Sequence, residues 1–208
     1  MTTDPLQPRT DLRQRVLASE VTFGAFAGLA SPIAAEILGR TGLDWAILDL
    51  EHSTLTEADL LPGIYALQAT SATALVRVEE GTRLRIGRAL DMGAEGLMIP
   101  RLETVEQVEA AVSAMQFPPG GIRGLALSTR GAGQGSVAHA DIQRLNALPV
   151  GIFQIESPTA VANAQAMAAI EGVDVLFVGP TDLSHSLGVP GQFTHPTFTE
   201  ALDTVAAA

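Results

Sequence analysis

Short apolar runs alternate with longer segments in which apolar residues recur at helical spacing, and this alternation continues along the whole chain. Runs that are apolar throughout are typical of strands buried on both faces of a parallel sheet. The pattern therefore predicts an α/β fold in which a helix follows each strand. The six predicted strands are residues 21–27, 45–50, 72–78, 96–100, 150–156 and 173–178.

Capping signals mark where several of the predicted helices begin. Ser31 and Ser157 each precede a proline, which suits the first position of a helix. Thr56 and Thr104 open segments with the spacing of a capping box. The other helices are expected near residues 11–19, 83–92, 141–147 and 198–207, and residues 1–9 are expected to form a flexible tail. The glycine- and proline-rich residues 117–135 predict a long functional or disordered loop.

Composition and charge narrow the class of protein. A chain of 208 residues that is 47% hydrophobic fits a single barrel or sheet domain over residues 1–208. The net charge of −11 argues against nucleic acid and anionic membranes, but a local arginine or metal can still attract an anionic substrate. The absence of cysteine excludes disulfides and thiol catalysis. Without a signal-peptide pattern or a membrane-spanning apolar run, the expected location is the cytoplasm.

Two architectures fit this alternation, a doubly wound open sheet and a (β/α)₈ barrel. Polar residues follow four of the predicted strands, whereas the strand interiors are almost free of charge. In a barrel all strand ends meet around one opening, but in an open sheet only those near the switch point converge. The pattern therefore favours the barrel, although the chain is shorter than the roughly 250 residues that are typical of one. The polar strand ends are Asp49, Glu51 and His52, then Arg77, then Gln154 and Glu156, and finally Asp182.

These residue types are suited to chemistry on an enolate beside a metal ion. Glu156 and Asp182 offer hard oxygen ligands for a divalent cation such as Mg²⁺ or Mn²⁺. Arg77 could stabilise a developing oxyanion, and His52 could transfer protons near neutral pH. Asp91 could orient the imidazole. The sequence therefore indicates a metal-assisted site built from several strand ends.

Each of these residues also has an ordinary structural explanation. Glu156 and Asp182 could complement helix dipoles, and for either alone that is the more common case. Arg77 could be an ion-pair partner, and His52 could be an unremarkable loop residue. The functional interpretation depends on the convergence of these residues in space.

In combination and order, the motifs resemble the HpcH/HpaI aldolase family, and most closely its 4-hydroxy-2-oxoheptanedioate aldolase branch. The resemblance covers about residues 20–205. It implies a (β/α)₈ barrel of the phosphoenolpyruvate/pyruvate type and a class II aldolase that requires Mg²⁺, Mn²⁺ or Co²⁺. Such enzymes reversibly cleave a 4-hydroxy-2-oxo acid to pyruvate and an aldehyde. The motifs are Asp49-Leu50-Glu51-His52, Val76-Arg77, Leu90-Asp91-Met92-Gly93-Ala94, Pro118-Pro119-Gly120-Gly121-Ile122-Arg123-Gly124, Gln154-Ile155-Glu156 and Phe177-Val178-Gly179-Pro180-Thr181-Asp182-Leu183-Ser184.

The resemblance also implies a role for each reacting group. Glu156 and Asp182 would be the metal ligands. Arg77 would hold the 2-oxo oxygen and hence the enolate. His52, paired with Asp91, would pass protons through a metal-bound water.

Further residues would bind pyruvate or order water. The resemblance implies that Gln154 lines the pyruvate pocket. The backbone N–H groups of Thr181 and Asp182 would hold the carboxylate. Asp49 and Glu51 would order waters bound to the metal.

The sequence departs from the family at three places. Phe26 stands where relatives often have tryptophan, and Leu50 replaces a frequent glycine. Relatives continue for two further strand–helix units, so residues 1–208 are expected to be an incomplete account of a homo-oligomeric enzyme. Two alternatives stay open: a lyase acting on coenzyme A esters, as in the citrate lyase and malyl-CoA lyase branch, and a truncated inactive paralogue that serves as a binding partner.

Overall fold

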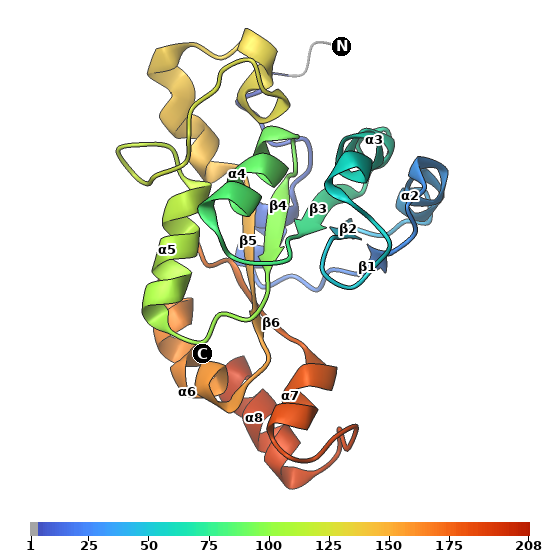
Figure 1. Cartoon of the computed structure of the whole chain (residues 1–208), viewed down its shortest axis with the longest axis vertical. Helices are drawn as coiled ribbons and strands as arrows, with labels where there is room; N and C mark the ends of the chain where they lie inside the picture. The colour runs from blue at the N-terminus through green and yellow to red at the C-terminus, as the bar shows by residue number, and fades with distance from the viewer. Residues whose placement is uncertain (1–3) are drawn as a thin grey trace.

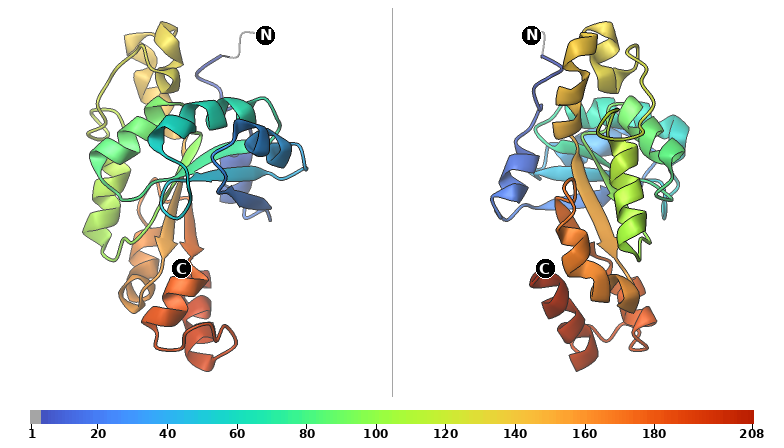
Figure 2. Two further views of the ribbon diagram at one scale, coloured as in Figure 1. Left: turned by 45° about the vertical axis from the view of Figure 1, so that its right-hand side comes forward. Right: turned by 90° about the vertical axis from the view of Figure 1, so that its left-hand side faces the viewer.

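The computed structural model describes residues 4–208, and its six strands form one parallel sheet (Figure 1). The strands pair in the order of the chain, from β1 to β6, and every neighbouring pair is parallel. A doubly wound sheet would reverse its strand order at a switch point. The sequential order therefore excludes that alternative and confirms the barrel. Figure 2 shows the strand direction turning steadily across a curled, open part of a (β/α)₈ barrel.

The boundaries of the elements follow the predicted alternation, with shorter first and last strands. The strands are β1 (Gly24–Ala27), β2 (Trp45–Asp49), β3 (Thr73–Arg77), β4 (Gly96–Ile99), β5 (Val150–Ile155) and β6 (Val175–Val178). The α-helices are α1 (Leu12–Leu17), α2 (Pro32–Gly39), α3 (Glu57–Gln68), α4 (Arg83–Asp91), α5 (Val105–Met115), α6 (Pro158–Ala168), α7 (Pro180–Ser186) and α8 (Pro196–Ala206). Two 3₁₀ segments, η1 (Arg130–Gly135) and η2 (His139–Ala147), occupy much of the long connection before β5. Within residues 4–208, no helix has the length and apolar character needed to cross a membrane.

The predicted caps are present at the helix starts. Ser31 and Ser157 accept hydrogen bonds from backbone N–H groups three residues later, at 3.3 and 3.1 Å. Thr104 forms a capping box with Gln107, and Thr56 forms one with Asp59. These bonds satisfy N–H groups that a helix leaves without partners, so the local sequence fixes where each helix begins.

The two-residue period of the strands separates an inner from an outer face. Outward side chains such as Leu48 and Val76 pack in the main core with residues of the helices. The inner face has its own buried cluster, formed by Leu12, Ile47, Leu75, Met98, Val150 and Ile152. Because side chains alternate between faces, Asp49, Arg77 and Gln154 lie on the inner face, each two residues beyond a member of this cluster. The period thus directs these polar groups into the barrel at the carboxyl end of the sheet.

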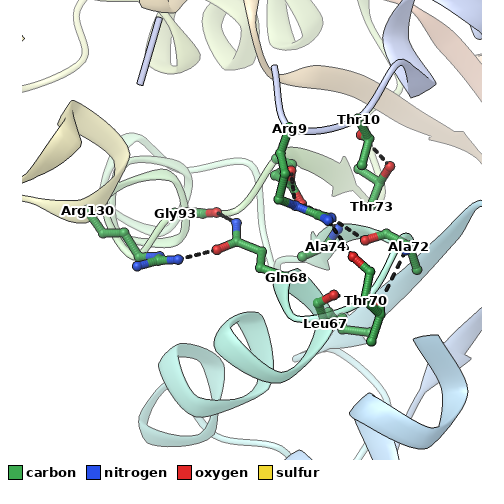
Figure 3. Close-up of polar contacts among 11 residues, drawn as sticks. Arg9, Thr10, Leu67, Gln68, Thr70, Ala72, Thr73, Ala74, Gly93 and Arg130 are labelled. Atoms are coloured by element: carbon green, nitrogen blue, oxygen red, sulfur yellow. Dashed lines mark hydrogen bonds and ion pairs between the residues drawn. The ribbon is translucent and has the colours of Figure 1, made fainter. Parts of the chain in front are cut away.

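The N-terminal segment covers the opposite, amino end of the sheet (Figure 3). Arg9 donates a hydrogen bond to the Thr70 carbonyl at 2.7 Å and forms an ion pair with Glu95 at 2.9 Å. Thr10 Oγ1 lies 2.7 Å from Thr73 Oγ1, and Leu12 is buried in the inner cluster. Arg9 therefore fastens this segment to the sheet. The flexibility expected for residues 1–9 stays a prediction, and residues 1–3 lie outside the described residues.

Candidate active site

Polar side chains from β2, β3 and β5 meet at the carboxyl end of the sheet. Asp49 and Arg77 are direct neighbours in the register of β2 and β3, and both end their strands. Gln154 belongs to β5, and Glu156 follows that strand directly. In a parallel barrel these ends converge, and the active sites of this fold lie there.

Asp49 fixes the orientation of Arg77 through a bidentate ion pair. Arg77 Nε donates to Asp49 Oδ1 at 2.7 Å and Nη2 donates to Oδ2 at 2.6 Å, with both residues buried. Asp49 also accepts the backbone N–H groups of Glu51 and His52, at 3.0 and 3.3 Å. Burial opposes ionisation of Asp49, but the hydrogen bonds outweigh it and hold the pKa of this carboxyl below its usual value. Both oxygens of Asp49 thus accept hydrogen bonds from protein donors, and its role in ordering metal-bound water stays a prediction.

Arg77 contacts two further groups. Its Nη1 lies 3.4 Å from Glu51 Oε2, and its guanidinium carbon lies 4.8 Å from the centre of the Phe26 ring. Phe26 in turn packs edge to face against Phe177 of β6, with 6.2 Å between ring centres. Burial opposes protonation, but the neighbouring carboxylates raise the pKa of Arg77, so the guanidinium stays charged. Phe26 is therefore part of the support for Arg77.

Glu156 is held on three sides. Its Oε1 accepts a hydrogen bond from Gln154 Nε2 at 2.9 Å, and its Oε2 accepts the backbone N–H of Arg101 at 3.2 Å. The carboxylate also packs closely on Gly179, where a Cβ atom would lie 2.5 Å from Oε1. These contacts aim the carboxylate into the space between β5 and the start of α7.

Negative charge at this end of the sheet exceeds the positive charge of Arg77. Burial, together with the charges of Glu51 and Asp182, raises the pKa of Glu156. Burial also raises the pKa of Glu51, although Arg77 opposes that effect. Because Arg77 is paired bidentately with Asp49, Glu156 forms no ion pair with an arginine of residues 4–208.

This excess fits a divalent cation. Gln154 Oε1 is buried without a hydrogen-bond partner among residues 4–208, and buried Glu51 Oε2 has only its ion-pair contact with Arg77 at 3.4 Å. Carboxylate and amide oxygens are the ligands that Mg²⁺ and related hard cations prefer. No three His, Asp or Glu side chains of the described chain form a ready metal cage. Glu156 and Asp182 could therefore supply two ligands and leave other positions to water or substrate.

The comparisons with known proteins agree with this geometry. The profile of the HpcH/HpaI aldolase/citrate lyase family matches residues 22–208. The chain belongs to the HpcH/HpaI aldolase family. A 5-keto-4-deoxy-D-glucarate aldolase from Klebsiella pneumoniae subsp. pneumoniae is 40% identical over 191 residues, which cover 92% of this chain and 74% of that relative.

Solved structures of the HpcH/HpaI family have the same fold. A family protein from Burkholderia cenocepacia J2315 aligns with a TM-score of 0.90 at 36% identity, covering 95% of this chain and 79% of its own. The HpcH/HpaI aldolase from Desulfitobacterium hafniense DCB-2 aligns with a TM-score of 0.87 at 31% identity, covering 94% and 76%. The described strands therefore correspond to the barrel of these relatives.

Most of the residues expected from the HpcH/HpaI motifs lie at the carboxyl end of the sheet. His52 has a largely exposed side chain whose Nε2 lies 3.6 Å from Glu51 Oε1. Thr181 and Asp182 lie in the first turn of α7, where backbone N–H groups have no acceptor within the helix. Asp182 is exposed, and its charge acts on nearby Glu156.

Asp91 is the exception, and its expected pairing with His52 does not occur within this chain. Helix α4 runs from the carboxyl end of β3 back to the amino end of β4, and Asp91 is its last residue. Its carboxylate accepts a hydrogen bond from Arg123 Nη2 at 2.8 Å. His52 follows β2 at the other end of the sheet. A pair of His52 and Asp91 would therefore require two copies of the chain.

The sequence analysis missed Arg101 as a site residue, and it quoted Gly179 in a motif without foreseeing its contact with Glu156. Arg101 has a left-handed backbone with φ of 60°, which is uncommon for a residue other than glycine, and its N–H contacts Glu156. Its position directly after the strand predicted over residues 96–100 was a signal that could have identified it. The packing of Gly179 on Glu156 joins two separate elements, and no local pattern reveals such a contact.

A cavity of about 630 Å³ lies at the amino end of the sheet, away from these residues. Arg9 and Arg13 line it, but both are already bound, to Glu95 and Asp174, at 2.9 Å in each case. Figure 3 shows the Arg9 contacts fastening the N-terminal segment to the sheet. These ion pairs serve the fold, so the carboxyl end remains the candidate active site.

The contact between Gly179 and Glu156 gives a first prediction. Gly179→Ala should displace the Glu156 carboxylate, because the added Cβ would lie 2.5 Å from Oε1. We expect Mn²⁺ affinity, measured by calorimetric titration, to fall roughly 10- to 100-fold, as it does when the support of a metal ligand is disturbed. Gly87→Ala is the control, since a Cβ there meets nothing within 4 Å. Unchanged Mn²⁺ affinity in Gly179→Ala would show that this contact does not position a ligand.

Proposed function

We propose that this chain is a metal-dependent aldolase that reversibly cleaves a 4-hydroxy-2-oxo acid to pyruvate and an aldehyde. The observation that carries the proposal is the juxtaposition of the buried Arg77–Asp49 pair with Glu156, whose carboxylate forms no ion pair within residues 4–208. Membership of the HpcH/HpaI aldolase family supports a carbon–carbon lyase. The buried carboxylate of Glu156 supports the further proposal that the enzyme binds a metal ion.

The reaction breaks the bond between C3 and C4 of the substrate. A base removes the proton of the 4-hydroxyl group, the C4–O bond becomes the aldehyde carbonyl, and the electron pair of the broken bond passes to C3 and the 2-oxo oxygen. Arg77 is a fixed donor for that oxygen, because Asp49 and Phe26 hold its planar guanidinium in place. Glu156 and Asp182 would hold a divalent cation, which would act as a Lewis acid toward the 2-oxo acid.

His52 is the proposed proton carrier. Its imidazole is exposed at the carboxyl end of the sheet, and its Nε2 is 3.6 Å from Glu51. It would take the proton of the 4-hydroxyl group and return one to C3 of pyruvate. Asp91 could orient His52 only from a second copy of the chain, which the expected homo-oligomer would supply.

The remaining residues would position pyruvate. Gln154 is buried on the inner face, and its Oε1 has no hydrogen-bond partner in the described chain. It would line the pocket beside Glu156. The backbone N–H groups of Thr181 and Asp182 would bind the substrate carboxylate at the start of α7, as the family resemblance implies.

A covalent imine route has no support in this chain. Class I aldolases form a Schiff base on a lysine amine. All 12 basic residues of the 208-residue sequence are arginine. The printed sequence therefore offers no lysine for that route, which supports the proposal that Arg77 and a cation stabilise the enolate by a class II mechanism.

The relatives suggest a candidate substrate. Proteins that are 38–40% identical to this chain carry the name 5-keto-4-deoxy-D-glucarate aldolase. That compound is a 4-hydroxy-2-oxo acid with a second carboxylate at its far end. We propose it, or a diacid of the same pattern, as the substrate.

Decarboxylation of oxaloacetate tests the function without a choice of aldehyde, because it passes through the same pyruvate enolate. We expect pyruvate release, followed with lactate dehydrogenase, to stop in EDTA and to return with Mg²⁺, Mn²⁺ or Co²⁺. Cleavage of 5-keto-4-deoxy-D-glucarate is then measured in the same assay. Full decarboxylase activity in a metal-stripped enzyme would contradict the class II assignment.

A further inference from the structure

We propose that Arg101 forms a second anion-binding subsite, which holds the far carboxylate of an acidic aldehyde during cleavage and condensation. The inference rests on the proposed function and deepens it, because it names the residue that would select 4-hydroxy-2-oxo diacids over substrates with a neutral far end. Three independent observations support it.

The first observation is the position of the Arg101 backbone. Its N–H donates to Glu156 Oε2 at 3.2 Å, so Arg101 directly borders the carboxylate that would bind the cation. The left-handed φ of 60° turns the chain after β4. Such conformations are costly for residues other than glycine and cluster at functional sites.

The second observation is that the Arg101 side chain is exposed and uncommitted. Its guanidinium has no hydrogen bond or ion pair with any side chain or carbonyl of residues 4–208. Arg77 cannot serve a second carboxylate, because Asp49 and Glu51 already engage it. Arg101 therefore lies beside the Glu156 carboxylate and has a guanidinium group without a partner. The planar guanidinium is the side-chain group best suited to bind a carboxylate.

The third observation is the charge around the site. Glu51, Glu156 and Asp182 would repel a second carboxylate, and the chain as a whole carries −11. The charge of a cation bound by Glu156 and Asp182 would be neutralised by these two carboxylates and by the carboxylate of pyruvate. The positive charge of Arg101 reaches into this region, because it is among the charges that counteract the effect of burial on the pKa of Glu51. It supplies the additional positive charge that a diacid needs.

The test compares aldehydes that differ only at the far end. Tartronate semialdehyde carries a carboxylate where glyceraldehyde carries a CH₂OH group. Condensation of each with pyruvate is measured as kcat/KM for wild type, Arg101→Gln and Arg101→Lys. Every variant keeps the backbone N–H to Glu156, so the comparison isolates the side chain.

We expect Arg101→Gln to lower kcat/KM for tartronate semialdehyde roughly 10- to 100-fold, as for loss of a charged hydrogen bond. The value for glyceraldehyde should change less than about threefold, and Arg101→Lys should retain part of the preference for the acid. Arg83→Gln is the matched control, because Arg83 is also exposed and without a polar partner in the described chain, but begins α4 and has no contact with Glu156. It should behave as wild type with both aldehydes.

Exchange of the pyruvate methyl protons in D₂O, followed by NMR, separates this inference from the proposed function. The exchange needs the enolate but no aldehyde. A wild-type protein that does not exchange these protons in the presence of Mg²⁺ contradicts the proposed function itself. Normal exchange with equal losses for both aldehydes, or with no loss for either, in Arg101→Gln overturns the subsite. Arg101→Gln with impaired exchange would assign Arg101 to the support of Glu156 instead.

Discussion

Replacing Glu156 with glutamine is expected to lower metal-dependent kcat/KM by roughly 10³-fold or more. A metal ion supplies several kcal/mol of charge stabilisation in such reactions, and each 1.36 kcal/mol corresponds to a factor of ten in rate. Glutamine has nearly the same shape, so the packing on Gly179 and the hydrogen bond from Arg101 can persist. Loss of activity would then report the missing charge. Oxaloacetate decarboxylation and calorimetric titration with Mn²⁺ measure the two effects separately.

Glu200→Gln is the control for this change. Glu200 is an exposed residue of α8, so the substitution removes the same charge far from the strand ends. We expect this variant to match wild type in both measurements. Wild-type Mn²⁺ affinity in Glu156→Gln would remove Glu156 from the metal site.

Arg77→Lys is expected to lower kcat for oxaloacetate decarboxylation by about 10²- to 10³-fold, the usual effect of losing one oxyanion donor. Lysine keeps the positive charge but cannot reproduce the two parallel bonds to Asp49 at 2.6 and 2.7 Å. The retained charge prevents Asp49 from becoming an unpaired buried anion. Arg77→Ala would leave that anion and would destabilise the fold by about 3–5 kcal/mol.

Thermal unfolding of the two Arg77 variants separates catalysis from stability. Arg77→Lys should lose turnover with a small change in melting temperature, whereas Arg77→Ala should lose both. Proton exchange on pyruvate should fall in parallel with decarboxylation. If Arg77→Lys decarboxylates oxaloacetate at the wild-type rate, the arginine is a structural ion-pair partner and the enolate is stabilised elsewhere.

The fold was predictable from the sequence because the strand patterns and the helix caps are both local signals. Each apolar run contains the information for one buried strand, and each capping residue, such as Ser31 or Thr104, fixes one helix start. The choice of a barrel required one further argument, the polar residues after four of the strands. The sequential strand order confirms it.

The site residues were predictable only where the alternation along a strand determines which face of the sheet a side chain lies on. Asp49, Arg77 and Gln154 follow the two-residue alternation, which places them on the inner face. Asp91 belongs to a helix, and the family motifs do not say whether it acts within its own chain. Arg101 depends on a left-handed turn after β4, and Gly179 on contact between separate elements. The turn and the contact arise from tertiary structure, so the one signal in the sequence was the position of Arg101 after the strand predicted over residues 96–100.

The sequential pairing of the strands also has a consequence for how the chain folds during synthesis. Every strand of the described sheet pairs only with the strand before or after it, and the longest interval separates β4 from β5. Each new strand can therefore join the growing sheet soon after it leaves the ribosome, because its partner has already been made. Contacts between distant parts of a chain slow folding, and in this sheet each pairing joins strands that are neighbours in the sequence. Up to β4, folding can keep pace with translation, and the connection carrying η1 and η2 is where we expect a pause.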